Sequence, residues 1–324
     1  MTARQVAESG VGWGRIKKSM ADVPPVSSGA TYSRYLQQVR GDLMTLTKAR
    51  LSFLVLVTTV FGYAVAAKDS GSFSFAMLFH LALGTIMCAF GSSVFNQLME
   101  SDQDARMPRT SDRPLPSQRI PKAAAFVLGW LLCAFGLMHL GAKVNIFAAA
   151  MAAATLFTYL FLYTPLKRLS SANTLVGAVS GALPPLIGWT GGGGEIVSWG
   201  ALDLFALLFF WQLPHFAAIN WMYRDDYVRG GFKMWSNEDP RGRKTARIAL
   251  GFASALTAVT ILFPLLTDLA APWAAVLGGI LGLPMIVLSM IFRWTGTYVS
   301  ARRLFFYTLL YLPLAMLSVY FAWR

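Results

Sequence analysis

Residues Gly91–Pro116 read GSSVFNQLMESDQDARMPRTSDRPLP. This stretch begins as the end of an apolar segment and becomes a run of acids followed by arginines. A second stretch of the same kind, HFAAINWMYRDDYVRGGFKM, covers His215–Met234. Charged side chains are expensive in hydrocarbon, so a functional site is expected where they adjoin a membrane span. The sequence therefore predicts two charged motifs at one membrane face, held there by a bundle of apolar helices.

The composition is that of a membrane protein. The chain has 324 residues, of which 56% are hydrophobic and 13% are charged, whereas a soluble globular chain carries about 25% charged residues. Many apolar runs reach roughly 20 residues, which is long enough to cross a bilayer. We therefore predict an all-α membrane protein with about nine transmembrane helices in one bundle. The predicted spans are 51–67, 75–100, 122–142, 145–163, 172–190, 199–222, 247–267, 272–292 and 303–322.

The basic residues divide unequally between the two sides of this bundle. All but three of the 28 Lys and Arg residues fall before the first span or in the connections after spans two, four, six and eight. The exceptions are Lys68, Lys143 and Arg324. Because excess Lys and Arg marks the cytoplasmic face, this asymmetry predicts a cytoplasmic N-terminus. The net charge of +13 is thus explained by membrane orientation, and no nucleic-acid partner is expected.

Residues 1–43 form a polar arm before the first predicted span. The arm contains the basic residues Arg15, Lys17 and Lys18, and they are not followed by the apolar run of a secretory signal. We expect an irregular cytoplasmic arm that rests on anionic membrane lipid, with a mitochondrial presequence as the alternative. Residues 44–324 are expected to form one intramembrane domain.

Three oxygen-bearing side chains recur every four residues at the end of the second span. Asn96, Glu100 and Asp104 fall within about 80° of one face of an α-helix. Such ligands suit Mg²⁺, which binds through few carboxylates together with substrate phosphates. Three arginines follow this stripe, and their planar guanidinium groups match phosphate oxygens in geometry. The pattern predicts a metal and diphosphate site, with a solvated helix end as the simpler alternative. The following arginines are Arg106, Arg109 and Arg113.

The second motif also carries acids at the end of a span. His215 and Asp226 are eleven residues apart, so they would share a face if the helix continued through both. Asp225 and Asp226 are adjacent and cannot both face inward from a regular helix. The acids are candidates for metal binding; alternatively they pair with neighbouring bases, and His215 packs between helices. The neighbouring bases are Arg224, Arg229 and Lys233.

A few residues outside the two motifs also carry structural information. Lys167 and Arg168 follow the fourth span, on the same predicted side as the acidic stripe. Pro184–Pro185 should kink the fifth span. Cys88 and Cys133 fall inside apolar spans and are expected to be small core residues rather than a disulfide or redox pair.

The motifs resemble those of a known family. The stretch NQLMESDQDARMPRTSDRPL resembles the first aspartate-rich motif of the intramembrane aromatic prenyltransferases, the UbiA superfamily. YTPLKR, NTLVGAVSGALPPLIGW and WQLPHF with YRDDYVRGGFKM resemble more narrowly its protoheme IX farnesyltransferase branch. The resemblance extends from about Leu43 to the C-terminus. It implies nine transmembrane helices around a central cavity, with both acidic motifs at the cytoplasmic mouth.

The resemblance also implies roles for single positions. Three positions depart from the broad superfamily: Gln97 and Glu100 stand where aspartate is common, and Tyr227 stands where a third acid of the second motif is common. The implied metal ligands are Asn96, Glu100, Asp104, Asp225 and Asp226, all but Asp225 also being catalytic. The implied diphosphate contacts are Arg109, Arg113, Lys167 and Arg168, and the implied haem-side residues are His215 and Tyr227.

The implied reaction transfers the farnesyl group of farnesyl diphosphate to the 2-vinyl group of haem b, with Mg²⁺ as cofactor, and gives haem O. The implied location is the bacterial inner membrane or, alternatively, the mitochondrial inner membrane, with haem A synthase or an oxidase-assembly protein as a candidate partner. Two other functions stay open. A prenyltransferase for a quinone precursor or a chlorophyll-type ring would use the same motifs. A membrane transporter would place polar groups through the full bilayer depth, whereas these acids gather at one face.

Overall fold

The computed structural model describes residues 29–324 and divides the chain into two compact units, with the boundary between Leu43 and Met44. The described part of the first unit belongs to α2 (Gly29–Leu46), a helix of 18 residues. The expectation of an irregular arm is therefore wrong from Gly29 onwards. The basic cluster of Arg15, Lys17 and Lys18 lies outside the described residues.

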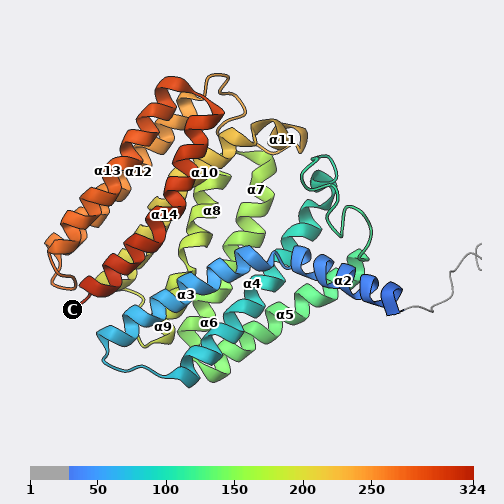
Figure 1. The fold of residues 1–324 in the computed structure, drawn as a ribbon. Coiled ribbons are helices and arrows are strands. Elements are labelled where there is room, and N and C mark those ends of the chain that lie inside the picture. The colour runs from blue at the N-terminus through green and yellow to red at the C-terminus, as the bar shows by residue number, and fades with distance from the viewer. Residues whose placement is uncertain (1–28) are drawn as a thin grey trace, which may run out of the picture. The chain divides into compact units, whose positions relative to one another are not determined.

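The second unit is built from helices (Figure 1). Eight helical segments among residues 29–324 are long and apolar enough to cross a membrane, which confirms the all-α membrane class. In chain order the helices are α3 (Ala49–Asp69), α4 (Phe75–Asp104), α5 (Lys122–Lys143), α6 (Ile146–Phe157), a π-helical segment (Thr158–Tyr163), α7 (Thr164–Leu169), α8 (Asn173–Ala182), α9 (Pro184–Gly191), α10 (Trp199–Met222), α11 (Arg224–Arg229), α12 (Arg243–Leu266), α13 (Trp273–Thr295) and α14 (Tyr298–Ala322).

The fifth predicted span, 172–190, is two short helices instead of one long one. α8 ends at Ala182 and α9 begins at Pro184; Leu183 between them keeps helical backbone angles, so the predicted kink is an interruption of the helical hydrogen bonds. Two successive prolines cannot donate the hydrogen bonds that would continue α8, but they suit the first turn of a new helix. The Pro184 carbonyl oxygen accepts a hydrogen bond from the Thr59 hydroxyl of α3 at 3.1 Å. The break therefore seats α9 directly against α3.

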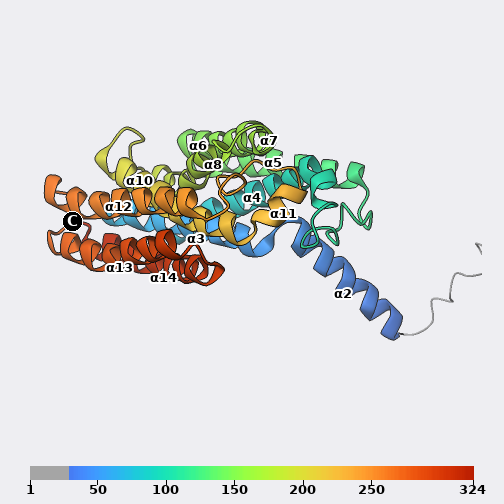
Figure 2. The same cartoon turned by 90° about the horizontal axis from the view of Figure 1, so that it is seen from above.

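The helices of the second unit form two groups. α10, α12, α13 and α14 pack on one another around a core that includes Leu207, Ala249 and Phe292. α4, α5, α6 and α9 form the other group, with Leu81 and Leu140 among its core residues. Figures 1 and 2 show α12–α14 together at the red end of the colour scale and α4–α6 as a separate group. α3 touches members of both groups.

The two cysteines lie in the interface between α4 and α5. Both are free thiols, as expected. A side chain at Gly136 would collide with the Cys88 sulfur, and one at Gly91 would collide with the Cys133 sulfur. Each thiol thus fills the space that a glycine leaves on the facing helix, and small residues of this kind let membrane helices approach closely. This close packing holds the first part of α5 beside the C-terminal end of α4, which carries the first charged motif.

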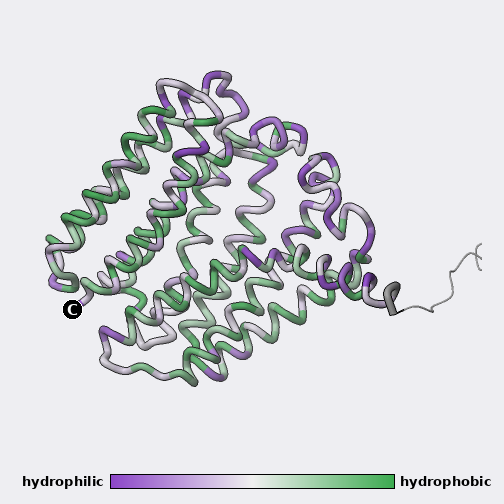
Figure 3. Tube along the Cα trace, in the orientation of Figure 1, coloured by the Kyte–Doolittle hydropathy of each residue, from purple (hydrophilic) through white to green (hydrophobic). Residues whose placement is uncertain are grey.

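Hydrophilic residues gather at the connections that follow α4 and α10. Figure 3 shows them along 101–121, around α11 and before α12, whereas the long helices are mostly apolar. Both charged motifs therefore lie in or beside these connections. The cytoplasmic placement of this end remains a prediction from the distribution of Lys and Arg.

Candidate active site

The predicted acidic stripe lies on the last turns of α4. This helix has 30 residues, about ten more than a bilayer span requires, so its C-terminal turns carry polar residues beyond the apolar part. Asn96, Glu100 and Asp104 are all buried, with 0%, 6% and 1% of their surfaces exposed. Buried polar groups need hydrogen-bond or charge partners. The stripe is therefore not a solvated helix end, and that alternative is wrong.

Both carboxylates of the stripe are paired with basic side chains from other segments. The Lys167 ammonium lies 2.8 Å from Glu100 Oε1, and Arg113 Nη1 lies 2.6 Å from Asp104 Oδ2. Lys167 comes from α7 and Arg113 from the connection after α4. Charge-assisted hydrogen bonds of this length are among the strong ones in proteins. The site thus brings together four of the predicted residues.

The remaining member of the stripe has a basic partner that the sequence analysis missed. The Lys48 ammonium donates a hydrogen bond to Asn96 Oδ1, while Asn96 Nδ2 donates to the Thr164 hydroxyl at 3.1 Å. Lys48 lies between α2 and α3 in the left-handed conformation, with φ 47° and ψ 48°. Burial lowers the pKa of Lys48 to about 7, although Glu100 opposes this effect. Lys48 is visible in the sequence as a lysine directly before an apolar span. It was counted only among the basic residues that indicate membrane orientation.

Lys167 also connects the first motif to the second. Its ammonium lies 4.6 Å from the centre of the Tyr163 ring and 5.6 Å from that of Phe232. The Lys233 backbone N–H donates to the Lys167 carbonyl at 2.7 Å. Lys167 follows the π-helical segment Thr158–Tyr163, and π-helical turns are frequent at functional sites. The segment after α11 is therefore fixed beside the stripe.

The connection after α4 makes a further contact with the second motif. Met107 packs with Phe232 and Met234, and Tyr227 borders the same cluster. The Arg109 guanidinium lies 5.2 Å from the centre of the Tyr223 ring. Both charged motifs consequently meet at one end of the second unit.

The residues of the second motif differ in position. Asp225 is exposed, and its closest basic atom is Arg224 Nε at 3.5 Å. Asp226 is half-buried, and within residues 29–324 its carboxylate has no hydrogen-bond or ion-pair partner. Burial raises the pKa of Tyr227, whose hydroxyl also feels the charges of Arg109 and Lys167. Tyr227 and Asp226 thus belong to the inner side of this motif, and Asp225 to its outer side.

The condition for a common face of His215 and Asp226 is not met, because the helix does not continue between them. α10 ends at Met222, and α11 begins at Arg224. The His215 ring lies between Trp211 and Phe305, with centre distances of 5.2 and 4.9 Å. Its Nδ1 is 2.8 Å from the Thr308 hydroxyl of α14. These contacts match the helix-packing alternative. Arg168 is exposed at the rim.

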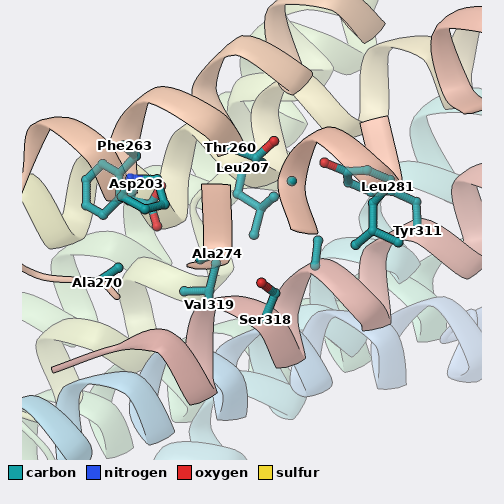
Figure 4. A pocket seen from close by; sticks show the side chains of 13 residues that line it. Asp203, Leu207, Thr260, Phe263, Ala270, Ala274, Leu281, Tyr311, Ser318 and Val319 are labelled. Carbon is teal, nitrogen blue, oxygen red and sulfur yellow. The ribbon is translucent and has the colours of Figure 1, made fainter. Parts of the chain in front are cut away.

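One buried acid lies far along α10 from these motifs. Asp203, 5% exposed, borders a cavity of about 30 Å³ between α10, α12, α13 and α14 (Figure 4). The fully buried Tyr311 hydroxyl, which also lines the cavity, makes no hydrogen bond of normal geometry. Within residues 29–324 the Asp203 carboxyl has no basic or hydrogen-bonding partner either. The cavity has room for about one or two water molecules. Asp203 was not among the predicted site residues.

The stripe fits Mg²⁺ by the chemistry of its donors. Asn96, Glu100 and Asp104 offer only oxygen ligands, which hard cations prefer. No group of three His, Cys, Asp or Glu residues within 29–324 lies close enough to hold a metal by itself. An amide oxygen and two carboxylates, completed by substrate phosphate oxygens, are the kind of ligand set that Mg²⁺ accepts.

The fold and this site define an intramembrane prenyltransferase. The profile of the UbiA prenyltransferase family matches residues 55–323, and the chain belongs to this family.

Curated relatives narrow the class to one branch. The chain is 41% identical over 291 residues to the protoheme IX farnesyltransferase of Opitutus terrae, covering 90% of this chain and 94% of that protein. It is 39% identical over 272 residues to the mitochondrial protoheme IX farnesyltransferase of Arabidopsis thaliana, covering 84% of this chain and 62% of that protein.

Solved structures share the fold. A structure of digeranylgeranylglyceryl phosphate synthase matches with a TM-score of 0.72 and 13% identity over 87% of this chain and 97% of that chain. A UbiA homologue from Archaeoglobus fulgidus, bound to GPP and Mg²⁺, matches with a TM-score of 0.58 and 12% identity over 86% of this chain and 99% of that chain. At these identities the likeness concerns the fold.

Proposed function

We propose that the chain transfers the farnesyl group of farnesyl diphosphate to the 2-vinyl group of haem b and so makes haem O. The observation that carries the proposal is the buried stripe of α4, in which Asn96, Glu100 and Asp104 each contact a basic side chain. Relatives that match most of the chain and are named protoheme IX farnesyltransferase support a farnesyl donor and a haem acceptor.

The basic side chains of the site serve the diphosphate group. Lys48, Lys167 and Arg113 hold the stripe by charge-assisted contacts. When diphosphate enters, these three donors turn from the stripe oxygens to phosphate oxygens, because phosphate carries more charge and accepts more hydrogen bonds. Arg109 and the exposed Arg168 are placed to attract the diphosphate at the rim.

The acids released by this exchange hold the metal. Asn96, Glu100, Asp104 and Asp226 are the proposed Mg²⁺ ligands, and Asp225 takes an outer position because its side chain is exposed. Mg²⁺, when bound there, supplies positive charge that stabilises the departing diphosphate. A protein of the same fold has been solved with Mg²⁺ and a prenyl diphosphate, which supports a shared requirement.

The reaction breaks the bond between C1 of the farnesyl chain and the diphosphate oxygen, and diphosphate leaves with the electron pair. The vinyl group attacks the allylic cation with its terminal carbon, and the new C–C bond leaves positive charge on the carbon next to the porphyrin. Water adds there and loses a proton, which gives the hydroxyethylfarnesyl side chain. Lys167, Arg113 and Lys48 contribute by stabilising charge on the leaving group. The rings of Tyr163 and Phe232 beside Lys167 shield this end from water.

The acceptor is the feature that separates this proposal from its nearest alternative. Tyr227 is the proposed haem-side residue at the mouth, since it is half-buried beside Arg109 and Lys167. His215 packs between α10 and α14 and is proposed to shape that wall rather than to bind haem. A bacterial inner membrane with this mouth toward the cytoplasm is the proposed setting, with haem A synthase as a candidate partner.

Mass spectrometry of the product tests the proposal. The purified chain in lipid nanodiscs is incubated with farnesyl diphosphate, MgCl₂ and either haem b or 4-hydroxybenzoate. We expect a haem product whose mass has increased by one farnesyl group and one hydroxyl group, and no prenylated benzoate. A prenylated benzoate without a haem product would instead favour the quinone-precursor alternative. Omission of MgCl₂ with added EDTA should abolish the haem product.

A further inference from the structure

α2 has an exposed apolar stripe. Tyr32, Tyr35, Leu36, Val39 and Leu43 are between 36% and 62% exposed. At 100° per residue these five positions fall within about 100° of the helix circumference, which is the width typical of an amphipathic helix. A stripe of this width, rather than scattered apolar residues, indicates a surface made to contact something apolar.

The other faces of α2 are polar and weakly basic. They carry Arg34, Gln37, Gln38 and Arg40, with Asp42 as the acid. A helix with one apolar face, a polar face that includes arginine and low overall hydrophobicity lies in a membrane interface and does not cross it. The composition of α2 therefore excludes it as a further span.

The chain itself connects α2 to a membrane surface. α2 ends at Leu46 and α3, a membrane span, begins at Ala49. The left-handed turn at Lys48 breaks the helix between them, so α2 does not continue into the bilayer along the axis of α3. Leu46 is fully buried in the second unit beside Val94 and Leu115. The C-terminal residue of α2 is thus packed in the second unit, with two residues between it and the start of the first span.

We propose that α2 lies in the plane of the membrane interface, with Tyr32, Tyr35, Leu36 and Val39 inserted at the boundary between headgroups and acyl chains. Tyrosine rings favour this boundary, and Arg40, which lies beside the edge of the stripe at about 100° from Val39, faces the phosphates of anionic lipids. The occupant of the stripe is lipid and not another protein, because α2 ends at Leu46 and a membrane span begins at Ala49. The inference does not depend on the proposed reaction.

Photocrosslinking in nanodiscs tests the inference on the full chain. A benzophenone amino acid is introduced in place of Val39, at the centre of the stripe, or in place of Gln37, about 160° away around the helix. The nanodiscs contain phosphatidylglycerol and phosphatidylethanolamine, and adducts are identified by mass spectrometry. We expect lipid adducts at position 39 at least about fivefold more abundant than at position 37, because only the former faces acyl chains.

Each other result overturns the inference. Equal lipid adducts at the two positions would place α2 outside the interface. Crosslinks from position 39 to protein, either a second copy or another segment of this chain, would identify a different occupant. The charge component is tested with the variant Arg40→Gln, which should lower the phosphatidylglycerol share of the adducts about twofold. An unchanged share would remove Arg40 from the proposal.

Discussion

The buried acids at the end of α4 and the buried acid near the start of α10 have the same burial and opposite surroundings. Glu100 and Asp104 are 6% and 1% exposed, and each has a basic partner within 3 Å. Asp203 is 5% exposed and faces a small cavity without a partner among the described residues. Burial of an acid alone therefore does not distinguish the proposed reaction site. The presence of basic partners from other segments does.

The difference has a physical reason. A buried carboxylate that will bind a cation needs a counter-charge before the cation arrives, because an unpaired buried charge is strongly destabilising. A lysine or arginine supplies this counter-charge. The same bases are then available for the phosphate oxygens of the substrate. A carboxyl group that binds nothing charged needs no basic partner, and the Asp203 carboxyl has none among the described residues. The two environments thus predict opposite results for substitution.

The largest difference is expected in turnover. Asp104→Asn keeps the size of the side chain but removes the charge that Arg113 and a metal would share. We expect the rate of haem O formation to fall by at least about 10²-fold, the usual effect of losing one electrostatic group at a reacting centre. Asp203→Asn is the control and should keep a rate within about twofold of the parent chain. Near-normal turnover of Asp104→Asn would remove Asp104 from the metal site.

The next difference is expected in stability. Lys167→Met removes the charge opposite Glu100 and leaves a carboxylate 6% exposed without its partner. Loss of one member of a buried pair costs about 3–5 kcal/mol, so the midpoint of thermal unfolding in detergent should fall clearly. The double variant Lys167→Met/Glu100→Gln should recover most of the midpoint but remain inactive. A single variant as stable as the parent would show that Glu100 is not charged or not dependent on Lys167.

Most of the membrane spans could be predicted from the sequence, because each is an apolar run long enough to be recognised without information from the rest of the chain. The fifth predicted span is not one continuous helix, because Pro184 and Pro185 cannot donate the backbone hydrogen bonds that would continue α8. α2 was missed for the opposite reason: its apolar residues recur every three or four positions and form no run, so only a 3.6-residue period would have found it. Asp203 is a single acid inside a predicted span, a pattern that by itself indicates a functional or structural site. It was not predicted as a site residue because only acids that occur in groups were.

The stripe of Asn96, Glu100 and Asp104 was predictable because it lies on one helix and follows helical spacing. Its partners were harder, because pairing depends on contacts between distant segments. The Lys48–Asn96 contact joins residues 48 positions apart, and the Lys167–Glu100 contact joins residues 67 apart. No local pattern encodes such pairs. The run of arginines after the span supplied Arg113, and the family resemblance supplied Lys167 as a diphosphate contact, but neither supplied Lys48.

A smaller effect of opposite sign is expected at Asp203. Asp203→Leu replaces a buried carboxyl that has no partner among residues 29–324 with an apolar side chain of similar size. We expect the chain to become more stable by about 1 kcal/mol, since replacing an unpaired buried polar group by an apolar one is neutral or favourable. The thermal midpoint in detergent measures this, with Leu207→Asp on the same cavity as the reverse control. A clear loss of stability in Asp203→Leu would mean that the carboxyl has a bound partner, and the contrast with Glu100 would disappear.

The smallest effect is expected at Asp225, which tests the contrast within a single motif. Its side chain is exposed, and its contact with Arg224 at 3.5 Å is an exposed ion pair, a kind that contributes at most about 1 kcal/mol. Asp225→Asn should therefore leave the thermal midpoint nearly unchanged and the rate of haem O formation within about twofold of the parent rate. Asp226→Asn at the adjacent, half-buried position is the matched control and should lower the rate while leaving the midpoint unchanged. If Asp225→Asn were the more damaging of the two, the outer acid would be the metal ligand, and exposure would be a poor guide to which acids of this site bind the cation.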